Sequence, residues 1–233
     1  MKLRYGLAFL AAALISIPTA SAASLNLAST HLTAVQTCIL SGYPNADTGE
    51  IDAMVEQNHA GTNYGTNAAI DVESHTTTNI RTYIEFLITG CTPAIPSTAT
   101  VLGATLRLYA TAVPNAVCRT EDIFPVTATW TETGITWNNQ PFGTTLNNPA
   151  SGYTSQMQVG TTCTTNTAAG YVTGWAVTTD VQKFVAGSAT NYGWMIRDDI
   201  EASATARTTT YEAKDGNSAT EDPELTISYI GAR

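Results

Sequence analysis

The chain has 233 residues, of which 43% are hydrophobic and only 12% charged, and its formal net charge is −9. An average soluble domain has about 25% charged residues, whereas here about 40 threonines replace much of the charge. Because threonine is β-branched and suits strands, this composition argues against a helical bundle or a coiled coil. The scarcity of Lys and Arg argues against a nucleic-acid-binding protein with a basic face.

The first segment, Met1–Ala22, has the pattern of a secretory signal peptide. Lys2 and Arg4 precede an apolar stretch, and small residues at 20–22 form a cleavage site. A retained membrane anchor is the alternative, but the apolar run is short for a span, and no later segment is apolar for about 18 residues. We therefore expect a secreted, extracellular protein without membrane insertion. Cleavage removes two of ten cationic residues and none of nineteen acids, which leaves a net charge of −11.

Residues 23–50 are weakly patterned, and we expect them to form an N-terminal extension or an extra strand. After them, short segments typical of strands recur between clusters of Gly, Asn, Pro and Thr. The predicted strands are Ile51–Glu56, Ala68–Glu73, Ile80–Ile88, Thr100–Ala110, Asp122–Ala128, Tyr171–Val177, Gly193–Asp198, Thr208–Glu212 and Leu225–Ile230. A helix is predicted at Thr179–Ala186, and a further helical turn near Thr131.

Apolar and polar side chains alternate within 80–88 and 105–109, which is typical of antiparallel sheet with one face in the core and one in water. About nine short strands, with no low-complexity linker between them, predict a single domain over residues 51–233. We expect an all-β fold, an antiparallel β-sandwich of jelly-roll type with one short helix.

Four cysteines follow the signal segment: Cys38, Cys91, Cys118 and Cys163. An even number in an exported chain favours two disulfides, for which there are three possible pairings. No two are close enough in the sequence for a redox or zinc motif. We favour Cys38–Cys91 with Cys118–Cys163, because this pairing attaches the N-terminal part to the rest of the chain.

Four groups of segments, read in order, resemble one family. They are Asp52–Val55 with Thr62–Gly65; Arg81–Phe86 with Ala104–Tyr109; Trp130–Glu132 with Thr136–Pro141; and Trp175–Thr178 with Val181–Gln182 and Asn191–Gly193. Together they resemble the DNRLRE-domain family, also classed as carbohydrate-binding module family 96, over roughly residues 51–230. The resemblance implies a β-sandwich module of secreted and cell-surface proteins that binds polysaccharide, with alginate among the ligands of the family.

The first candidate ligand surface is an outward sheet face. The alternation places Arg81, Tyr83 and Glu85 on one face, and Arg107 with Tyr109 would extend it if their strands are neighbours. Arg donates paired hydrogen bonds to hydroxyls or carboxylates, and Tyr offers a flat ring with a polar tip. The alternative is an ordinary solvated face with cross-strand Arg–Glu pairs.

The second candidate is the turn that carries Asn138 and Asn139 between Trp130 and Trp137. The two indoles could form a platform on which sugar rings stack, or they could close one end of the sandwich as core residues. The remaining tryptophans, Trp175 and Trp194, are expected in the core.

An acidic cluster of Asp198, Asp199 and Glu201 supplies the carboxylate oxygens that calcium prefers. A possible structural calcium is therefore weighed against an ordinary solvated acidic loop. No other cofactor is expected.

No catalytic signature of the kinds with known local motifs occurs in the sequence. The favoured function is a secreted, non-catalytic module that recognises a cell-wall or matrix polysaccharide. The alternatives are a structural or adhesive extracellular protein, and a secreted polysaccharide hydrolase or lyase. The negative charge favours a neutral glycan, or a polyanion bridged by calcium, over alginate alone. The ligand and the oligomeric state are left open by the sequence.

Overall fold

The computed structural model describes residues 34–41, 49–216, 218 and 220–231. These residues belong to one compact unit that begins at Thr33. The predicted signal peptide lies outside the described residues.

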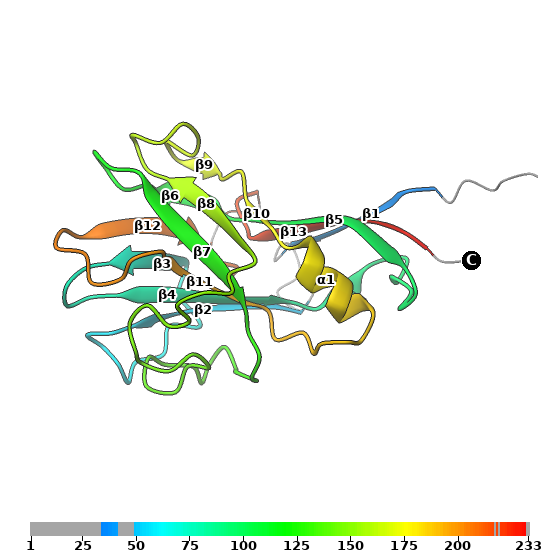
Figure 1. The fold of residues 1–233 in the computed structure, drawn as a ribbon, viewed down its shortest axis with the longest axis horizontal. Coiled ribbons are helices and arrows are strands. Elements are labelled where there is room, and N and C mark those ends of the chain that lie inside the picture. The colour runs from blue at the N-terminus through cyan, green and yellow to red at the C-terminus, as the bar shows by residue number, and fades with distance from the viewer. Residues whose placement is uncertain (1–33, 42–48, 217, 219, 232–233) are drawn as a thin grey trace, which may run out of the picture. The chain divides into compact units, whose positions relative to one another are not determined.

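The described chain forms two antiparallel sheets and one α-helix (Figure 1). The smaller sheet has the order β1-β13-β5-β10, with bounds Gln36–Ser41, Glu224–Ile230, Thr100–Arg107 and Trp175–Ala176. The larger sheet has the order β8-β7-β11-β4-β3-β12-β6-β9, and β2 also pairs with β4. Its strands are β2 Glu50–Glu56, β3 Ala69–Ser74, β4 Ile80–Phe86, β6 Tyr109–Ala112, β7 Arg119–Pro125, β8 Ser155–Val159, β9 Gly170–Tyr171, β11 Trp194–Asp198 and β12 Arg207–Glu212.

The strand order is that of a jelly roll with additions. Without β2, β4, β7, β8 and β11, eight strands remain. If these eight are renumbered from 1 to 8 along the chain, their order is 1-8-3-6 in the smaller sheet and 2-7-4-5 in the larger sheet. The first and last strands are therefore neighbours, and the chain crosses repeatedly between two sheets, as it does in two interlocked Greek keys. The predicted all-β sandwich with one short helix is confirmed.

The strand predictions differ from the structure mainly where the chain changes sheet. The predicted strand Thr100–Ala110 is two strands, β5 and β6, separated by the buried Leu108. The predicted Tyr171–Val177 likewise divides into β9 and β10. Alternation continues through the first of these breaks, so periodicity alone does not reveal it. Strand β8 was not predicted, and β1 lies within the segment expected to be an extension or an extra strand.

Helix α1, Thr178–Val185, lies against β5 and matches the predicted helix to within one residue at each end. Asp180 stands in its first turn and Lys183 in its last, which suits the helix dipole. Near Thr131 the structure has one turn, in which the amide of Ile135 donates to the Thr131 carbonyl over 2.9 Å. A short 3₁₀ helix, Ile88–Gly90, ends the predicted strand Ile80–Ile88 early.

The two favoured disulfides are present. Cys38–Cys91 joins β1 to the segment after β4, and Cys118–Cys163 closes the β7–β8 hairpin region. The first therefore ties the N-terminal strand covalently to the body of the sandwich.

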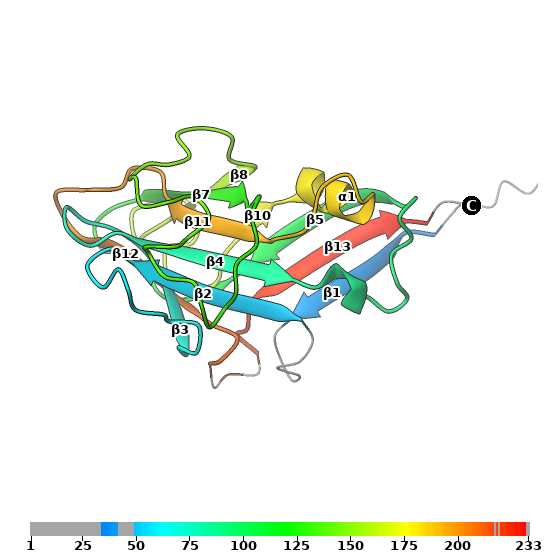
Figure 2. The same ribbon diagram turned by 90° about the horizontal axis from the view of Figure 1, so that it is seen from below.

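The large sheet is covered on both faces. One face joins the core between the sheets, which includes Trp175 and Trp194, both fully buried as predicted. A second apolar cluster lies on the other face, where residues 126–149 fold over β2, β4, β7 and β11. In Figure 2 this long connection runs across β2 and β4. Residues 126–149 therefore cover the face of β4 on which the first predicted ligand surface lies.

Candidate functional site

The predicted exposure of Arg81 and Tyr83 is wrong. Both side chains are fully buried, because the connection 126–149 packs over the face of β4 that carries them. Tyr83 packs against Trp130, with ring centroids 5.8 Å apart, and its hydroxyl donates to Gln140 over 3.0 Å. Burial raises the pKa of its phenol above the ordinary range. Neither side chain presents a surface to a ligand in this arrangement.

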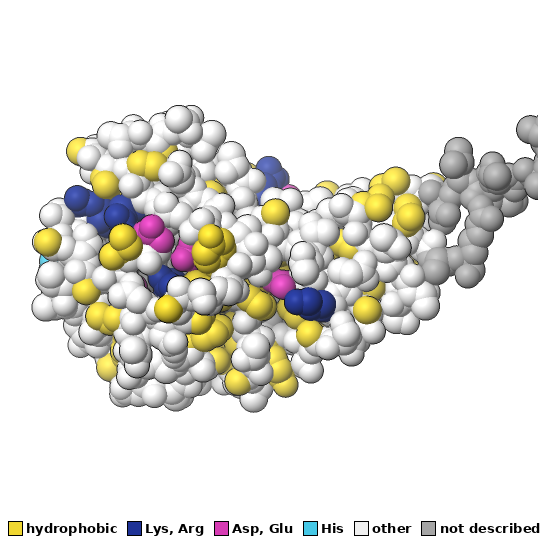
Figure 3. All heavy atoms as spheres, in the orientation of Figure 1, with side chains coloured by type: hydrophobic (Ala, Val, Ile, Leu, Met, Phe, Trp, Pro, Cys, Tyr) yellow, Lys and Arg dark blue, Asp and Glu magenta, His cyan; other side chains and the backbone are white. Residues whose placement is uncertain are grey.

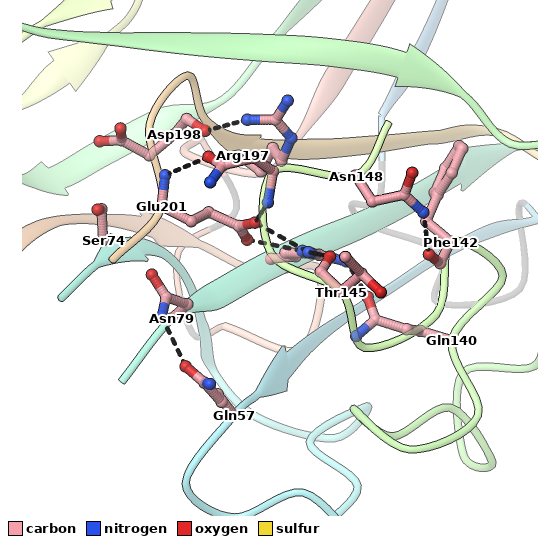
Figure 4. Close-up of polar contacts among 12 residues, drawn as sticks. Gln57, Ser74, Asn79, Gln140, Phe142, Thr145, Asn148, Arg197, Asp198 and Glu201 are labelled. Carbon is pink, nitrogen blue, oxygen red and sulfur yellow. Dashed lines mark hydrogen bonds and ion pairs between the residues drawn. The ribbon is translucent and has the colours of Figure 1, made fainter. Parts of the chain in front are cut away.

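Arg81 instead holds the covering connection in place through hydrogen bonds to Glu201, Gln140 and Thr145, which Figure 4 shows close to one another. Its guanidinium donates to both carboxylate oxygens of Glu201, at 2.7 and 2.9 Å. Its other bonds are to Gln140 and to the main-chain carbonyls of Gly143 and Thr145, between 2.7 and 3.1 Å. A guanidinium has five N–H donors, and five bonds are made here, so this buried charge is fully satisfied.

The two predicted platform tryptophans are also mostly buried. Trp130 is 8% exposed, and its indole donates to the Tyr192 carbonyl over 2.9 Å. Trp137 is 3% exposed and lies beneath the Arg81 guanidinium, 4.8 Å from the ring centroid. Both belong to the second apolar cluster on the outer face of the larger sheet, so they are core residues as in the alternative, but they cover a sheet face and do not close an end of the sandwich. The stacking role stays a prediction.

The two asparagines of this turn are exposed. Asn139 closes the turn with its own side chain, because Oδ1 accepts from the Thr136 amide over 2.7 Å and Nδ2 donates to the Gly134 carbonyl. Asn139, Trp130 and Ile135 line a depression of about 230 Å³. Asn138 lies beside it in the sequence, and its ligand role is untested.

Arg107 and Tyr109 lie apart from the rest of the predicted surface, around Tyr171 on the edge strand β9. The Arg107 guanidinium stands 4.9 Å from the Tyr171 ring centroid and donates to Glu224 over 2.8 Å. The Tyr109 ring meets Tyr171 edge-on at 5.4 Å, and a hydrogen bond with Glu221 raises the pKa of its phenol. Arg107 thus already covers part of the Tyr171 ring.

Glu85 is half-buried, and burial raises the pKa of its carboxyl. With Leu87, Ile88 and Asn191 it helps to line a separate depression of about 260 Å³ beside the end of β4. The five residues of the predicted surface are therefore distributed over three places.

The acidic cluster predicted for calcium is engaged by arginines. Asp198 and Asp199 both accept from Arg119, the second over 3.1 Å, and Glu201 pairs with Arg81. Burial raises the pKa of the Asp199 carboxyl to about 6. Within the part of the chain that the structure describes, no three acidic, His or Cys side chains gather in a way that could hold a metal ion.

A groove beside α1, absent from the sequence predictions, has the features of a ligand site. It consists of two adjoining depressions of about 280 and 300 Å³ that share Pro125, Asp180 and Lys183. We call it the α1 groove; its remaining lining is Val126, Thr127, Phe184, Ala189, Thr190 and Tyr192 in one depression, and Gly152, Tyr153, Thr154 and Thr179 in the other. Figure 3 shows an acidic and a basic side chain next to each other in the area of α1, and few other charged side chains are visible around them.

The floor of the α1 groove is rigidly held. Asp180 is 4% exposed, and its Oδ2 accepts from the Thr154 hydroxyl over 2.5 Å and from the Trp194 indole over 3.0 Å. Lys183 is exposed one helical turn away. Because Asp180 is fixed from two elements, its carboxylate is in place before any ligand arrives.

Tyrosines stand in both depressions of the groove. Tyr153 is 46% exposed, and its ring meets Phe124 edge-on at 6.4 Å. Tyr192 is half-buried and packs against the second apolar cluster. Aromatic rings with polar tips, hydroxyls and one charge of each sign are chemically suited to hydroxyl-rich ligands with apolar C–H faces.

The sequence contained part of this signal. The helix that carries Asp180 and Lys183 was predicted. Tyr153, however, lies in a connection without hydrophobic periodicity, between the predicted strand β7 and strand β8, which was not predicted. Only the fold brings residue 153 next to residue 180. An aromatic residue between Gly152 and Thr154, outside any apolar run, was the available local hint.

Comparison with known families gives one match. The family model described as carbohydrate-binding module family 96 matches residues 46–229, nearly the stretch over which the motifs indicated a resemblance. No curated protein matches the chain. Among the described residues, no helix is long and apolar enough to cross a membrane.

Proposed function

Because the chain belongs to carbohydrate-binding module family 96, we propose that it is a secreted, non-catalytic module that binds a cell-wall or matrix polysaccharide in the α1 groove. The observation that carries this proposal is the pairing of exposed Tyr153 with the fixed carboxylate of Asp180 and the exposed Lys183 around one open groove. The two disulfides are compatible with an extracellular location.

The chemistry of the groove favours a glycan with little net charge. Lys183 and Asp180 offset each other, and the rest of the lining is hydroxyl, aromatic or apolar. The formal charge of −9 would repel a strongly acidic polysaccharide at long range. Hydroxyl groups of a neutral sugar can donate to Asp180 and accept from Lys183, while its C–H face packs on a tyrosine ring.

Affinity electrophoresis through gels that contain single polysaccharides tests the placement of the site. Tyr153→Ala and Lys183→Ala are the test variants, and Tyr109→Ala with Arg107→Ala are matched controls at the other aromatic patch. We expect each test variant to weaken binding about tenfold, which corresponds to one lost contact of about 1.4 kcal/mol. Because all four side chains reach solvent, the fold should be retained, which far-ultraviolet circular dichroism checks.

The controls make the outcome decisive. If retention is lost in the Tyr109 and Arg107 variants and unchanged in the Tyr153 and Lys183 variants, the α1 groove is not the site and the edge patch around Tyr171 is. If the wild-type protein is retained by no polysaccharide, the binding function itself is contradicted.

A further inference from the structure

Two carboxylates near the turn between β12 and β13 are buried without hydrogen-bond partners. Glu50 begins β2 and is 4% exposed, and Asp222 lies two residues before β13 and is 1% exposed. All four of their side-chain oxygens are closed to solvent and unpartnered. Figure 2 shows the β12–β13 turn below β2, the element on which Glu50 stands. Leaving buried polar atoms without partners is costly, so this arrangement needs a physical reason.

The surroundings of this pair are acidic. Burial, then the charges of Asp52 and Asp222, raise the pKa of Glu50 well above its ordinary value. Burial, then the charge of Glu212, raises the pKa of Asp222 to about 6. Lys214 is close enough to oppose the charge on Glu50.

Lys214 does not neutralise the pair, however. Its ammonium binds Glu132 and Asp215, each over 3.0 Å, and not Glu50 or Asp222. Its main-chain amide donates to Asp52 over 2.8 Å. The cation near the pair is therefore already shared between two other carboxylates.

Protonation alone does not satisfy these groups either. A neutral carboxyl gains an O–H donor that itself needs an acceptor, and the two side chains make no hydrogen bond to each other or to any neighbour. The carboxylates of Glu50 and Asp222 therefore need a cation that binds oxygen, because protonation alone does not give them hydrogen-bond partners.

We propose that Glu50 and Asp222 bind one calcium ion. Calcium takes six to eight oxygen ligands, two carboxylates can supply up to four of them, and main-chain carbonyls and water complete such shells. A divalent ion also balances the two charges. Magnesium fits less well, because it demands a near-ideal octahedron and gives up its water reluctantly. The site is separate from the acidic cluster at Asp198, whose carboxylates are paired with arginines.

The experiment uses the purified protein after treatment with a chelator, at pH 8, where ionised carboxylates favour cation binding. Calcium binding is measured by equilibrium dialysis, and the melting temperature is recorded in chelator, in about 1 mM calcium and in about 1 mM magnesium. The variants are Glu50→Gln and Asp222→Asn, and Asp199→Asn is a control with the same change of charge. We expect one calcium per chain and a rise of about 5 °C or more in the melting temperature of the wild type and of Asp199→Asn.

In Glu50→Gln and Asp222→Asn the calcium-dependent rise should disappear. Without calcium, both variants should melt at or above the wild-type temperature, because each removes a buried unpaired charge. Absence of calcium uptake by the wild type would overturn the proposal. Loss of the rise in Asp199→Asn with retention in Glu50→Gln would also overturn it. If Glu50→Gln does not fold, Asp222→Asn is the deciding variant. Calcium binding retained by Asp222→Asn would contradict the proposed site.

Discussion

At the scale of single residues, the fold treats its buried charges in two ways. The Arg81 guanidinium and the Glu201 carboxylate satisfy each other, and main-chain groups of the connection 140–147 complete their hydrogen bonds: the Gly143 and Thr145 carbonyls accept from Arg81, and the Asn147 amide donates to Glu201. Glu121 has no cation bonded to it and instead accepts hydrogen bonds from the hydroxyls of Thr209 and Tyr211, at 2.6 and 2.7 Å. The first arrangement fixes a loop, and the second keeps an acid in the core.

Removing one member of the Arg81–Glu201 pair should be strongly destabilising. Arg81→Ala or Glu201→Ala leaves the remaining charge buried without a partner, which costs about 3–5 kcal/mol of the free energy of unfolding. Arg107→Ala, which breaks a half-exposed pair with Glu224, should cost less than about 1 kcal/mol. Urea unfolding measures both, and equal losses at the two sites would contradict the structural role of Arg81.

The sequence predicted which face of a strand a side chain occupies, but not whether another part of the chain covers that face. Alternation correctly put Arg81 and Tyr83 on the face of β4 opposite Ile84, but alternation cannot tell whether that face meets water or a folded connection. The hint was the apolar content of 126–149, where Trp130, Ile135 and Trp137 exceed what a solvated loop needs. For the α1 groove no local pattern exists, because its two tyrosines become neighbours of Asp180 only in the fold.

At the scale of elements, two Asn-Tyr-Gly segments form the same kind of turn. In each, the Asn side-chain oxygen accepts from the Gly amide two residues later, Asn63 from Gly65 and Asn191 from Gly193. The Asn amide then donates to carbonyls of a neighbouring segment, such as that of Phe86 for Asn191. Such Asx turns explain physically why these short motifs recur.

The glycine that ends the second motif is required by both conformation and space. Gly193 has φ +68°, and a Cβ there would lie 2.0 Å from the Ile84 carbonyl oxygen. Gly193→Ala should therefore cost about 3 kcal/mol or more of the free energy of unfolding. Gly143 has the same φ of +68°, but a Cβ added there would meet no atom within 4 Å, so Gly143→Ala should cost only about 1 kcal/mol. Urea unfolding measures both variants. Equal losses of unfolding free energy in Gly193→Ala and Gly143→Ala would contradict the close approach of residue 193 to the Ile84 carbonyl of β4.

At the scale of the whole molecule, buried acids make stability depend on pH. Burial raises the pKa of Glu121 from its ordinary 4.5 to about 7 and that of Asp199 from 3.8 to about 6. Between these ordinary and raised values the folded protein binds more protons than the unfolded chain. The free energy of unfolding therefore falls as the pH rises through this window.

The expected result is a protein that resists urea better at pH 5 than at pH 8, measured in chelator so that cations do not contribute. Glu121 supplies up to about 3 kcal/mol of the difference. Glu121→Gln should remove most of its share and flatten the profile, whereas Glu73→Gln, on the solvated side of β3, should not. A stability that rises from pH 5 to pH 8 would contradict the raised pKa values of these acids.

The architecture of the molecule was largely predictable, because threonine-rich alternation and regular turns leave few folds other than a sandwich. Four of the five added strands, β2, β4, β7 and β11, were predicted as strands, but their periodicity does not tell which sheet they join, and β8 was missed. The even number of cysteines predicted two disulfides, and the pairing favoured among the three possible ones is the pairing found. Long-range features, such as the crossing at Leu108 and the cover over β4, are decided by packing between distant segments.

The proposed function has two parts, that the chain binds polysaccharide and that it does not cleave it. Screening the wild-type protein on a glycan array, and then incubating it with each bound polysaccharide while reducing ends and unsaturated products are measured, tests both parts together. We expect binding to at least one polysaccharide of low charge, with no product above the buffer control. Binding to none, or accumulation of cleavage products, would contradict the proposed function.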